Sequence, residues 1–225
     1  MHNNHQIRIV RNNAYKGVTG ARRKDSALKY REYFGQLVAQ ERMILSSHLN
    51  DQHLTISCKK ECDYCCYQYI SISQLEGIAI VDFLYDKSEL IPHFIDNYKL
   101  WFRTAEEITK KIDELMWAFS ESGNNSLLWA TLPLYQTYFT IQVACPFLVE
   151  RNCIIYPIRP MVCALHYSSS LPAHCSIDST LSPQIFDIPL KESDLNVIAN
   201  ISPFGLFRKR FTLPSLIYLL LTKGT

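Results

Sequence analysis

Apolar residues recur with a helical period over two long stretches of the chain, residues 25–49 and 88–120. The apolar positions of these two stretches are Tyr30, Tyr33, Phe34, Leu37, Val38, Ile44 and Leu45, followed by Ile91, Phe94, Ile95, Tyr98, Phe102, Ala105, Ile108, Ile112, Leu115 and Phe119. Repeats three and four residues apart place side chains on one face of a helix. Pro92 falls in the first turns of the second stretch, where a missing amide costs least, and residues 123–125 (Gly-Asn-Asn) end it.

A further helix is predicted to begin after Ser73, because the run Ser73-Gln-Leu-Glu76 fits a capping box. Residues 135–143 alternate between apolar and polar positions, which predicts a strand. A hairpin-like knuckle follows over residues 145–156, with its turn at 150–152. Residues 157–190 contain five prolines and are expected to be irregular, and short helices are predicted near 191–200 and 213–222.

These elements predict a mainly α fold with irregular cysteine-bearing loops and a short β-hairpin, a helical domain stapled by metal. Residues 1–24 are locally basic and are expected to form an irregular arm, with one cysteine-cluster metal-binding domain over residues 25–225.

Composition narrows the function classes. Hydrophobic residues make up 48% of the 225 residues, and the net charge is only +2, from 23 basic against 21 acidic residues. This balance gives no reason to predict binding to nucleic acid or acidic lipid. No apolar run near the start has the length of a signal peptide, and the run at residues 216–221 is too short to span a bilayer. We therefore expect a cytoplasmic protein, where eight cysteines would not form stable disulfides.

The cysteines are the main chemical signal. Four lie within nine residues, Cys58, Cys62, Cys65 and Cys66, and four follow at wider spacing, Cys145, Cys153, Cys163 and Cys175. Thiolates are soft ligands, so this density predicts a site for zinc or for an iron–sulfur cluster such as [4Fe–4S]. The two groups reach one another only through folding, which would make the metal a clamp between the halves of the chain. Because adjacent cysteines tend to point in different directions, Cys65 and Cys66 can serve two centres, or one of them can be a packing thiol.

Three residues near the thiols are candidates for supporting roles. Arg159, held extended by the proline that follows it, could donate hydrogen bonds to thiolates or offset their charge. His166 could complete a mixed site or simply be solvated. Tyr64 flanks the thiols and is expected to shield them.

The run Cys58…Cys62…Cys65-Cys66, with Cys145-Pro-Phe-Leu and Cys153-x-Ile-Tyr-x-x-Arg-Pro-x-x-Cys163, resembles the zinc- or iron-chelating cysteine-cluster family called YkgJ-like after its CxxCxxCC motif. The resemblance covers roughly residues 56–166 and implies a metal site. Two features depart from the family pattern. Three residues separate Cys58 from Cys62 where the family usually has two, and Ala164 stands where the family commonly has arginine.

The longer first gap opens a second comparison. Cys58-x-x-x-Cys62-x-Tyr-Cys65 matches the short motif of radical S-adenosylmethionine enzymes, and the cluster is similar to that of flagellin lysine N-methylases. This likeness implies a [4Fe–4S] enzyme that uses S-adenosylmethionine to modify a peptide or protein side chain. The chain lacks the repeated strand–helix units and glycine-rich loops of standard enzymes of that kind. The first hypothesis is a metal-binding module that serves structure, metal handling or the binding of a protein or peptide partner. The enzyme is the second hypothesis, and a thiol–disulfide redox protein is the third.

Overall fold

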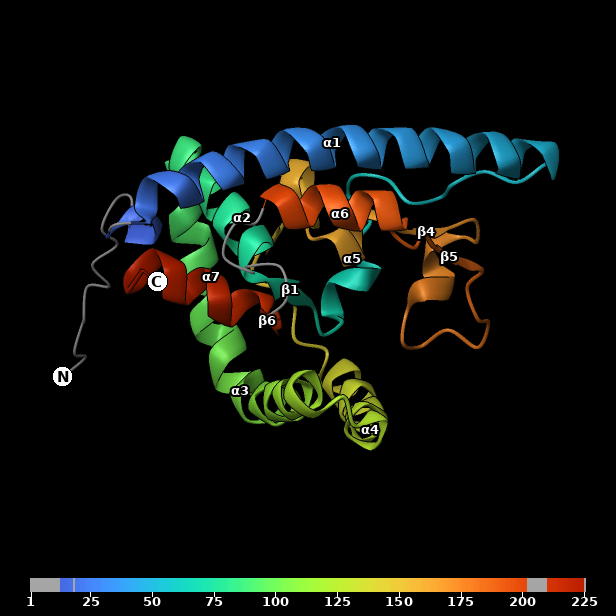
Figure 1. The fold of residues 1–225 in the computed structure, drawn as a ribbon. Coiled ribbons are helices and arrows are strands. Elements are labelled where there is room, and N and C mark those ends of the chain that lie inside the picture. The colour runs from blue at the N-terminus through green and yellow to red at the C-terminus, as the bar shows by residue number, and fades with distance from the viewer. Residues whose placement is uncertain (1–12, 18, 202–209, 225) are drawn as a thin grey trace.

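The computed structural model describes residues 13–17, 19–201 and 210–224, and this part of the chain is mainly helical (Figure 1). Its α-helices are α1 (Gly20–Asp51), α2 (Gln74–Asp86), α3 (Ile91–Ser122), α4 (Asn125–Ile141), α5 (Met161–Ala164), α6 (Glu192–Ile201) and α7 (Leu213–Thr222). Three antiparallel pairs of short strands accompany them: β1 (Ser71–Ser73) with β6 (Arg210–Thr212), β2 (Leu148–Val149) with β3 (Asn152–Cys153), and β4 (His166–Ser168) with β5 (Ile185–Asp187). The predicted mainly α fold with a short hairpin is confirmed.

Helices α1, α2, α3 and α7 form a helical frame around the apolar core. Helix α1 lies along one side of the molecule, with α2 packed beneath it and α7 packed against α2 (Figure 1). Helix α2 is enclosed on nearly all sides, and its residues Ile78 and Leu84 are buried in the core. Helix α3 contributes Trp101 to the same core. Gly77 permits the close approach of α7, since a Cβ at this position would lie 2.6 Å from Leu216 Cδ2. The frame is therefore stabilised by burial of apolar surface.

The helix boundaries largely match the sequence patterns. Ser73 caps α2 in a capping box with Glu76, as predicted. Pro92 lies in the first turn of α3, and Gly123 ends that helix with φ at 65°, a left-handed conformation that glycine adopts without strain. Helices α6 and α7 stand where the short C-terminal helices were predicted.

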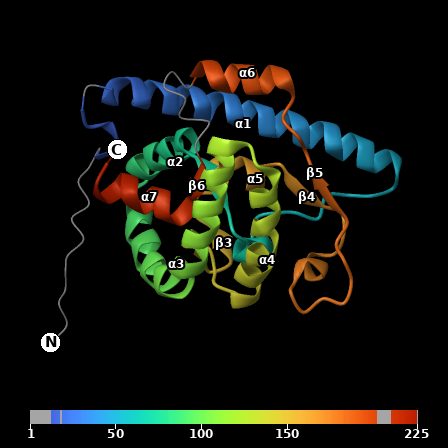
Figure 2. The same cartoon turned by 60° about the horizontal axis from the view of Figure 1, so that its bottom comes forward.

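The predicted strand at residues 135–143 is wrong, because residues up to Ile141 belong to helix α4. Its alternation coincides with a helical repeat in which Tyr135, Tyr138 and Ile141 face the core. Helices α3 and α4 lie side by side (Figure 2), and Trp101 Nε1 donates to Tyr138 Oη at 2.7 Å between them. Packing against α3 therefore outweighs the short alternating pattern.

Two further segments differ from expectation. The irregular region 157–190 contains the β4–β5 pair, in which His166 lies opposite Asp187. The predicted basic arm of residues 1–24 falls partly outside the described residues. Helix α1 already begins at Gly20 and Arg23 is buried in it, so residues 20–24 are helical rather than irregular. No helix in the described ranges is long and apolar enough to cross a membrane.

Candidate metal centre

All eight cysteines lie in the described residues, and all are free thiols. Cys58 and Cys62 lie in the loop between α1 and β1, and Cys65 and Cys66 in the 3-10 turn η2 (Tyr64–Tyr67). Cys145 follows α4, Cys153 is in β3, Cys163 is in α5, and Cys175 ends the 3-10 turn η5 (Pro172–Cys175). Segments far apart in sequence thus carry the thiols.

Cys65 is the thiol at which these segments meet. The Cys66 thiol donates a hydrogen bond to Cys65, which lowers the pKa of Cys65 below its ordinary value. The charge of Cys65 in turn raises the pKa of the seven other thiols, those of Cys58, Cys62, Cys66, Cys145, Cys153, Cys163 and Cys175. The structure therefore brings all eight predicted ligands into one region, although ligation itself stays a prediction.

Main-chain hydrogen bonds hold the cysteine segments together. The Cys145 amide donates to the Cys66 carbonyl at 2.7 Å, which joins the first cysteine loop to the segment after α4. On the other side, the Ser57 amide donates to the Ser168 carbonyl at 2.8 Å, and the Ser168 amide donates to Cys58 Sγ at 3.1 Å. These bonds fix the backbone around the thiols without help from a disulfide among the eight cysteines.

Three cysteines receive an amide hydrogen bond from the residue two positions later. Tyr64, Phe147 and Ile155 supply these amides, to Cys62, Cys145 and Cys153 respectively, and each bond acts to lower the pKa of its thiol. An amide directed at sulfur stabilises the thiolate, which is the form that binds metal.

Burial works in the opposite direction. It is the largest cause that raises the pKa of Cys145 to about 12 and the pKa of Cys153 to about 11. Without a metal, these enclosed thiols are therefore protonated at neutral pH, and a metal ion must displace their protons to bind.

The three predicted supporting residues lie beside the thiols. The charge of Arg159 lowers the pKa of four thiols, those of Cys58, Cys65, Cys153 and Cys163, and its guanidinium lies 4.2 Å from the Tyr156 ring centroid. His166 Nδ1 lies 2.7 Å from Asp187 Oδ1, and its charge lowers the pKa of Cys65. Tyr64 contributes through its backbone amide.

The extra residue of the first gap has a local structural consequence. Glu61 adopts a φ of 73°, and the Cys62 amide donates to the Lys59 carbonyl at 3.3 Å. The left-handed residue closes a turn before Cys62, so the longer spacing still keeps Cys62 near Cys65. Ala164, the other departure, is buried in the core.

The eight thiols are suitable donors for a thiophilic metal, but in the described residues they are not arranged around a common point. Across residues 13–17, 19–201 and 210–224, no three cysteine, histidine, aspartate or glutamate side chains are already arranged to hold an ion. The hydrogen bond to Cys65 keeps a proton on the Cys66 thiol, and metal binding at Cys66 would displace that proton. Eight thiols, with amides and a guanidinium to stabilise thiolates, match the preferences of zinc and of iron–sulfur clusters.

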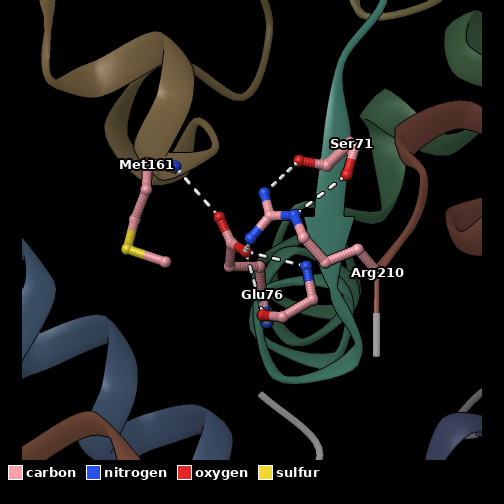
Figure 3. Close-up of polar contacts among 5 residues, drawn as sticks. Ser71, Glu76, Met161 and Arg210 are labelled. Atoms are coloured by element: carbon pink, nitrogen blue, oxygen red, sulfur yellow. Dashed lines mark hydrogen bonds and ion pairs between the residues drawn. The ribbon is translucent and has the colours of Figure 1, made fainter. Parts of the chain in front are cut away.

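Sequence reasoning missed a buried carboxylate that positions one of the thiol segments (Figure 3). Glu76 is 1% exposed, and its Oε2 accepts from the Ser73 amide at 2.8 Å while its Oε1 accepts from the Met161 amide at 3.0 Å. Met161 begins α5, which carries Cys163. Arg210 Nη1 lies 4.0 Å from Glu76 Oε2, and Arg210 Nε donates to Ser71 Oγ at 2.9 Å. The capping box was readable from sequence, but the bond to Met161 has no sequence signal.

A cavity of about 760 Å³ lies beside the thiols. Cys65 and Cys163 are in its wall, together with the aromatic rings of Tyr69 and Tyr135 and the side chain of His166. A small molecule in this cavity would therefore contact the thiol region directly.

Comparison with known proteins identifies a family for this chain. The model of a family described as "CxxCxxCC: Putative zinc- or iron-chelating domain" matches residues 57–181, which include all eight cysteines and more than half of the chain. No curated protein and no solved structure matches the chain.

Proposed function

We propose that this chain, which belongs to the CxxCxxCC family of zinc- or iron-chelating domains, is a metal-binding protein whose eight cysteines hold zinc or an iron–sulfur cluster. The observation that carries the proposal is the convergence of thiols from separate segments on Cys65. A metal would cross-link these segments and add to the main-chain hydrogen bonds between them. Eight thiols exceed the four of one closed zinc site, which favours an iron–sulfur cluster or more than one centre.

The residues around the thiols have defined tasks in this function. The amides of Tyr64, Phe147 and Ile155 stabilise thiolates at Cys62, Cys145 and Cys153. Several thiolates around one cation leave net negative charge, which Arg159 offsets. Met161 is held by Glu76, which fixes the segment of Cys163 relative to the helical frame.

The test is metal analysis of the full chain purified without oxygen, together with acid-labile sulfide and the visible spectrum. Zinc, or iron with sulfide, is expected in stoichiometric amount. Cys65→Ser should lower the metal content, because the charge of Cys65 acts on every other thiol, whereas Ser47→Ala on the exposed face of α1 should leave it unchanged. A folded, colourless preparation with neither zinc nor iron would overturn the proposal.

A second candidate function is a [4Fe–4S] enzyme that uses S-adenosylmethionine to modify a peptide or protein side chain. The cavity in whose wall Cys65 and Cys163 lie supports it, because a cosubstrate there would be next to the thiols. Within this cavity, Tyr69 and Tyr135 would bind an apolar or planar group, while the His166–Asp187 pair would bind a polar one.

The enzyme hypothesis predicts a brown protein whose electron paramagnetic resonance spectrum changes when S-adenosylmethionine is added to the reduced form. Gln136→Trp, which fills the cavity from α4, should abolish the change without loss of iron. Stoichiometric zinc in place of iron would exclude this second function and leave the first intact.

A further inference from the structure

We infer that the eight thiols form two metal-binding sites that meet at Cys65 and Cys66. The outer set consists of Cys58, Cys62, Cys65 and Cys175, and the inner set consists of Cys66, Cys145, Cys153 and Cys163. The inference rests on the proposed metal binding and adds to it the number of centres and the ligands of each.

The inner set is assembled by main-chain bonds around the segment after α4. The Cys145 amide donates to the Cys66 carbonyl at 2.7 Å, and the Leu148 amide donates to the Cys145 carbonyl at 2.8 Å. Leu148 pairs with Cys153 across the β2–β3 hairpin, so the hairpin brings Cys153 back toward Cys145. The charges of Cys145 and Cys153 raise the pKa of both Cys66 and Cys163, as the charge of Cys65 also does.

The outer set is assembled on the β4–β5 side. The Ser168 amide donates to Cys58 Sγ at 3.1 Å, and the Ser168 hydroxyl donates to the thiol of Cys175. The turns η2 and η5, which carry Cys65 and Cys175, pack against each other. Apart from Cys65, the thiols that act on Cys58, Cys62 and Cys175 belong to this same set.

Cys65 and Cys66 divide the two sets because they are neighbours in one 3-10 turn. The thiols that act on Cys66, besides its neighbour, are those of Cys145 and Cys153, all in the inner set. The charge of Cys65 acts on both sets, but the inner set already has four thiols without it, and four is the number that a tetrahedral thiolate site requires. Cys65 therefore completes the outer set, and each site has four ligands.

The sites differ in how firmly the fold holds them. The inner segment is anchored in the core, since Phe147 is fully buried and stacks on Phe94 at 4.5 Å. The loop of Cys175 is exposed, and Leu171 and Leu181 within it are 69% and 58% accessible. The outer site should consequently exchange its metal faster and lose it first to a chelator.

The test is to titrate the metal-free, reduced full chain with Cd²⁺ without oxygen and to count bound ions by native mass spectrometry. Two ions per chain are expected. Cys175→Ser and Cys163→Ser should each retain one, and Ser176→Ala is the matched control that retains two. One ion in the wild type that both cysteine variants lose would overturn the two-site inference and leave the proposed function intact. No bound ion in any form would overturn both.

Alkylation of the Cys175→Ser variant gives an independent measurement, since the inner variant can fail to fold. With Cd²⁺ bound, iodoacetamide should modify Cys58 and Cys62 of this variant while Cys145 and Cys153 stay protected. Equal modification of both sets would contradict the inference.

Discussion

The helical frame and the outer cysteine loops are stabilised in different ways. Ten of the thirteen residues of α2 are buried, and α3 adds Phe94 and Trp101 to the same core. By contrast, no residue of 57–67 or of 169–187 is buried. The frame can therefore fold by removing apolar surface from water, whereas the outer loops cannot.

The inner cysteine segment lies between these two extremes. Residues Ile155, Ile158 and Met161 are buried, and Glu76 accepts a hydrogen bond from the Met161 amide. This segment is attached to the frame, and its Cys145 and Cys153 are partly buried against the core. From this difference we expect a bound metal to stabilise the outer loops most and the frame least.

Metal removal should have the largest effect on stability, and it should affect the outer cysteine loops and not the helical frame. Thiolate-bound zinc contributes about 10–16 kcal/mol in small zinc domains, far more than one side chain does. Under reducing conditions, a chelator should therefore make residues 57–67 and 169–184 sensitive to protease, while far-ultraviolet circular dichroism retains the helical signal. Limited proteolysis with mass spectrometry measures this. Loss of the helical signal before loop cleavage would contradict it.

Trp101→Ala should produce the next largest effect, on the frame alone. Trp101 is 1% exposed and donates to Tyr138, so its loss should cost about 3–5 kcal/mol of unfolding free energy. Urea denaturation followed by circular dichroism measures this change, and metal stoichiometry without urea should be unchanged. Trp129→Ala is the matched control, because Trp129 is 67% exposed and its removal should cost under about 0.5 kcal/mol. If the folded Trp101 variant lost its metal, metal binding would depend on the packing of the frame, contrary to this prediction.

The frame could be predicted from sequence because its signals are local. The capping box at Ser73 and the apolar repeat of α3 each lie within a single element. The strand prediction for residues 135–143 failed because a run of nine residues can fit both a strand period and a helical period. Contacts with α3, such as that between Tyr138 and Trp101, favour the helix.

The site could be predicted only as a set of residues. Cysteine density identified the thiols, and Arg159 and His166 were named from their positions near them. The bond from Met161 to Glu76 joins residues 85 positions apart, and the approach of Cys175 to Cys58 depends on the β4–β5 pair. Such contacts arise from the packing of distant segments, so no local pattern records them.

Glu76→Gln should have a smaller effect that couples the frame to the inner segment. The amide nitrogen of glutamine cannot accept a hydrogen bond, so either the Ser73 or the Met161 amide loses its buried acceptor. The expected cost is about 1–3 kcal/mol of unfolding free energy. Metal should also dissociate faster, because α5 is less firmly held. Stopped-flow transfer of metal to a chromophoric chelator measures this rate. Glu106→Gln, an exposed position on α3, is the control, and an unchanged dissociation rate in the Glu76 variant would separate α5 from the metal.

Asp113→Asn should have the smallest effect, and it tests the frame at a polar site. Burial is the largest cause that raises the pKa of Asp113 above its ordinary value of 3.8, against hydrogen bonds from Thr212 Oγ1 at 2.6 Å and Tyr69 Oη at 2.5 Å. The folded state thus binds this proton more tightly than the unfolded state does. The resulting stabilisation is present below pH 3.8 and is lost as pH rises through the raised pKa.

Asparagine stays neutral. Its single carbonyl oxygen accepts from one hydroxyl, and the other hydroxyl can rotate to accept from the side-chain amide N–H. The Asp113→Asn variant should therefore remain within about 1 kcal/mol of wild type at pH 7, with a flatter dependence of stability on pH above 3.8. Urea denaturation at pH 4, 5 and 7 measures the slope, and Asp96→Asn, which is exposed on α3, should leave it unchanged. If the Asp113 variant kept the wild-type slope, the buried carboxylate would not be the group that makes frame stability depend on pH. The frame would then owe that dependence to groups outside its core, and burial alone would not separate it from the cysteine loops.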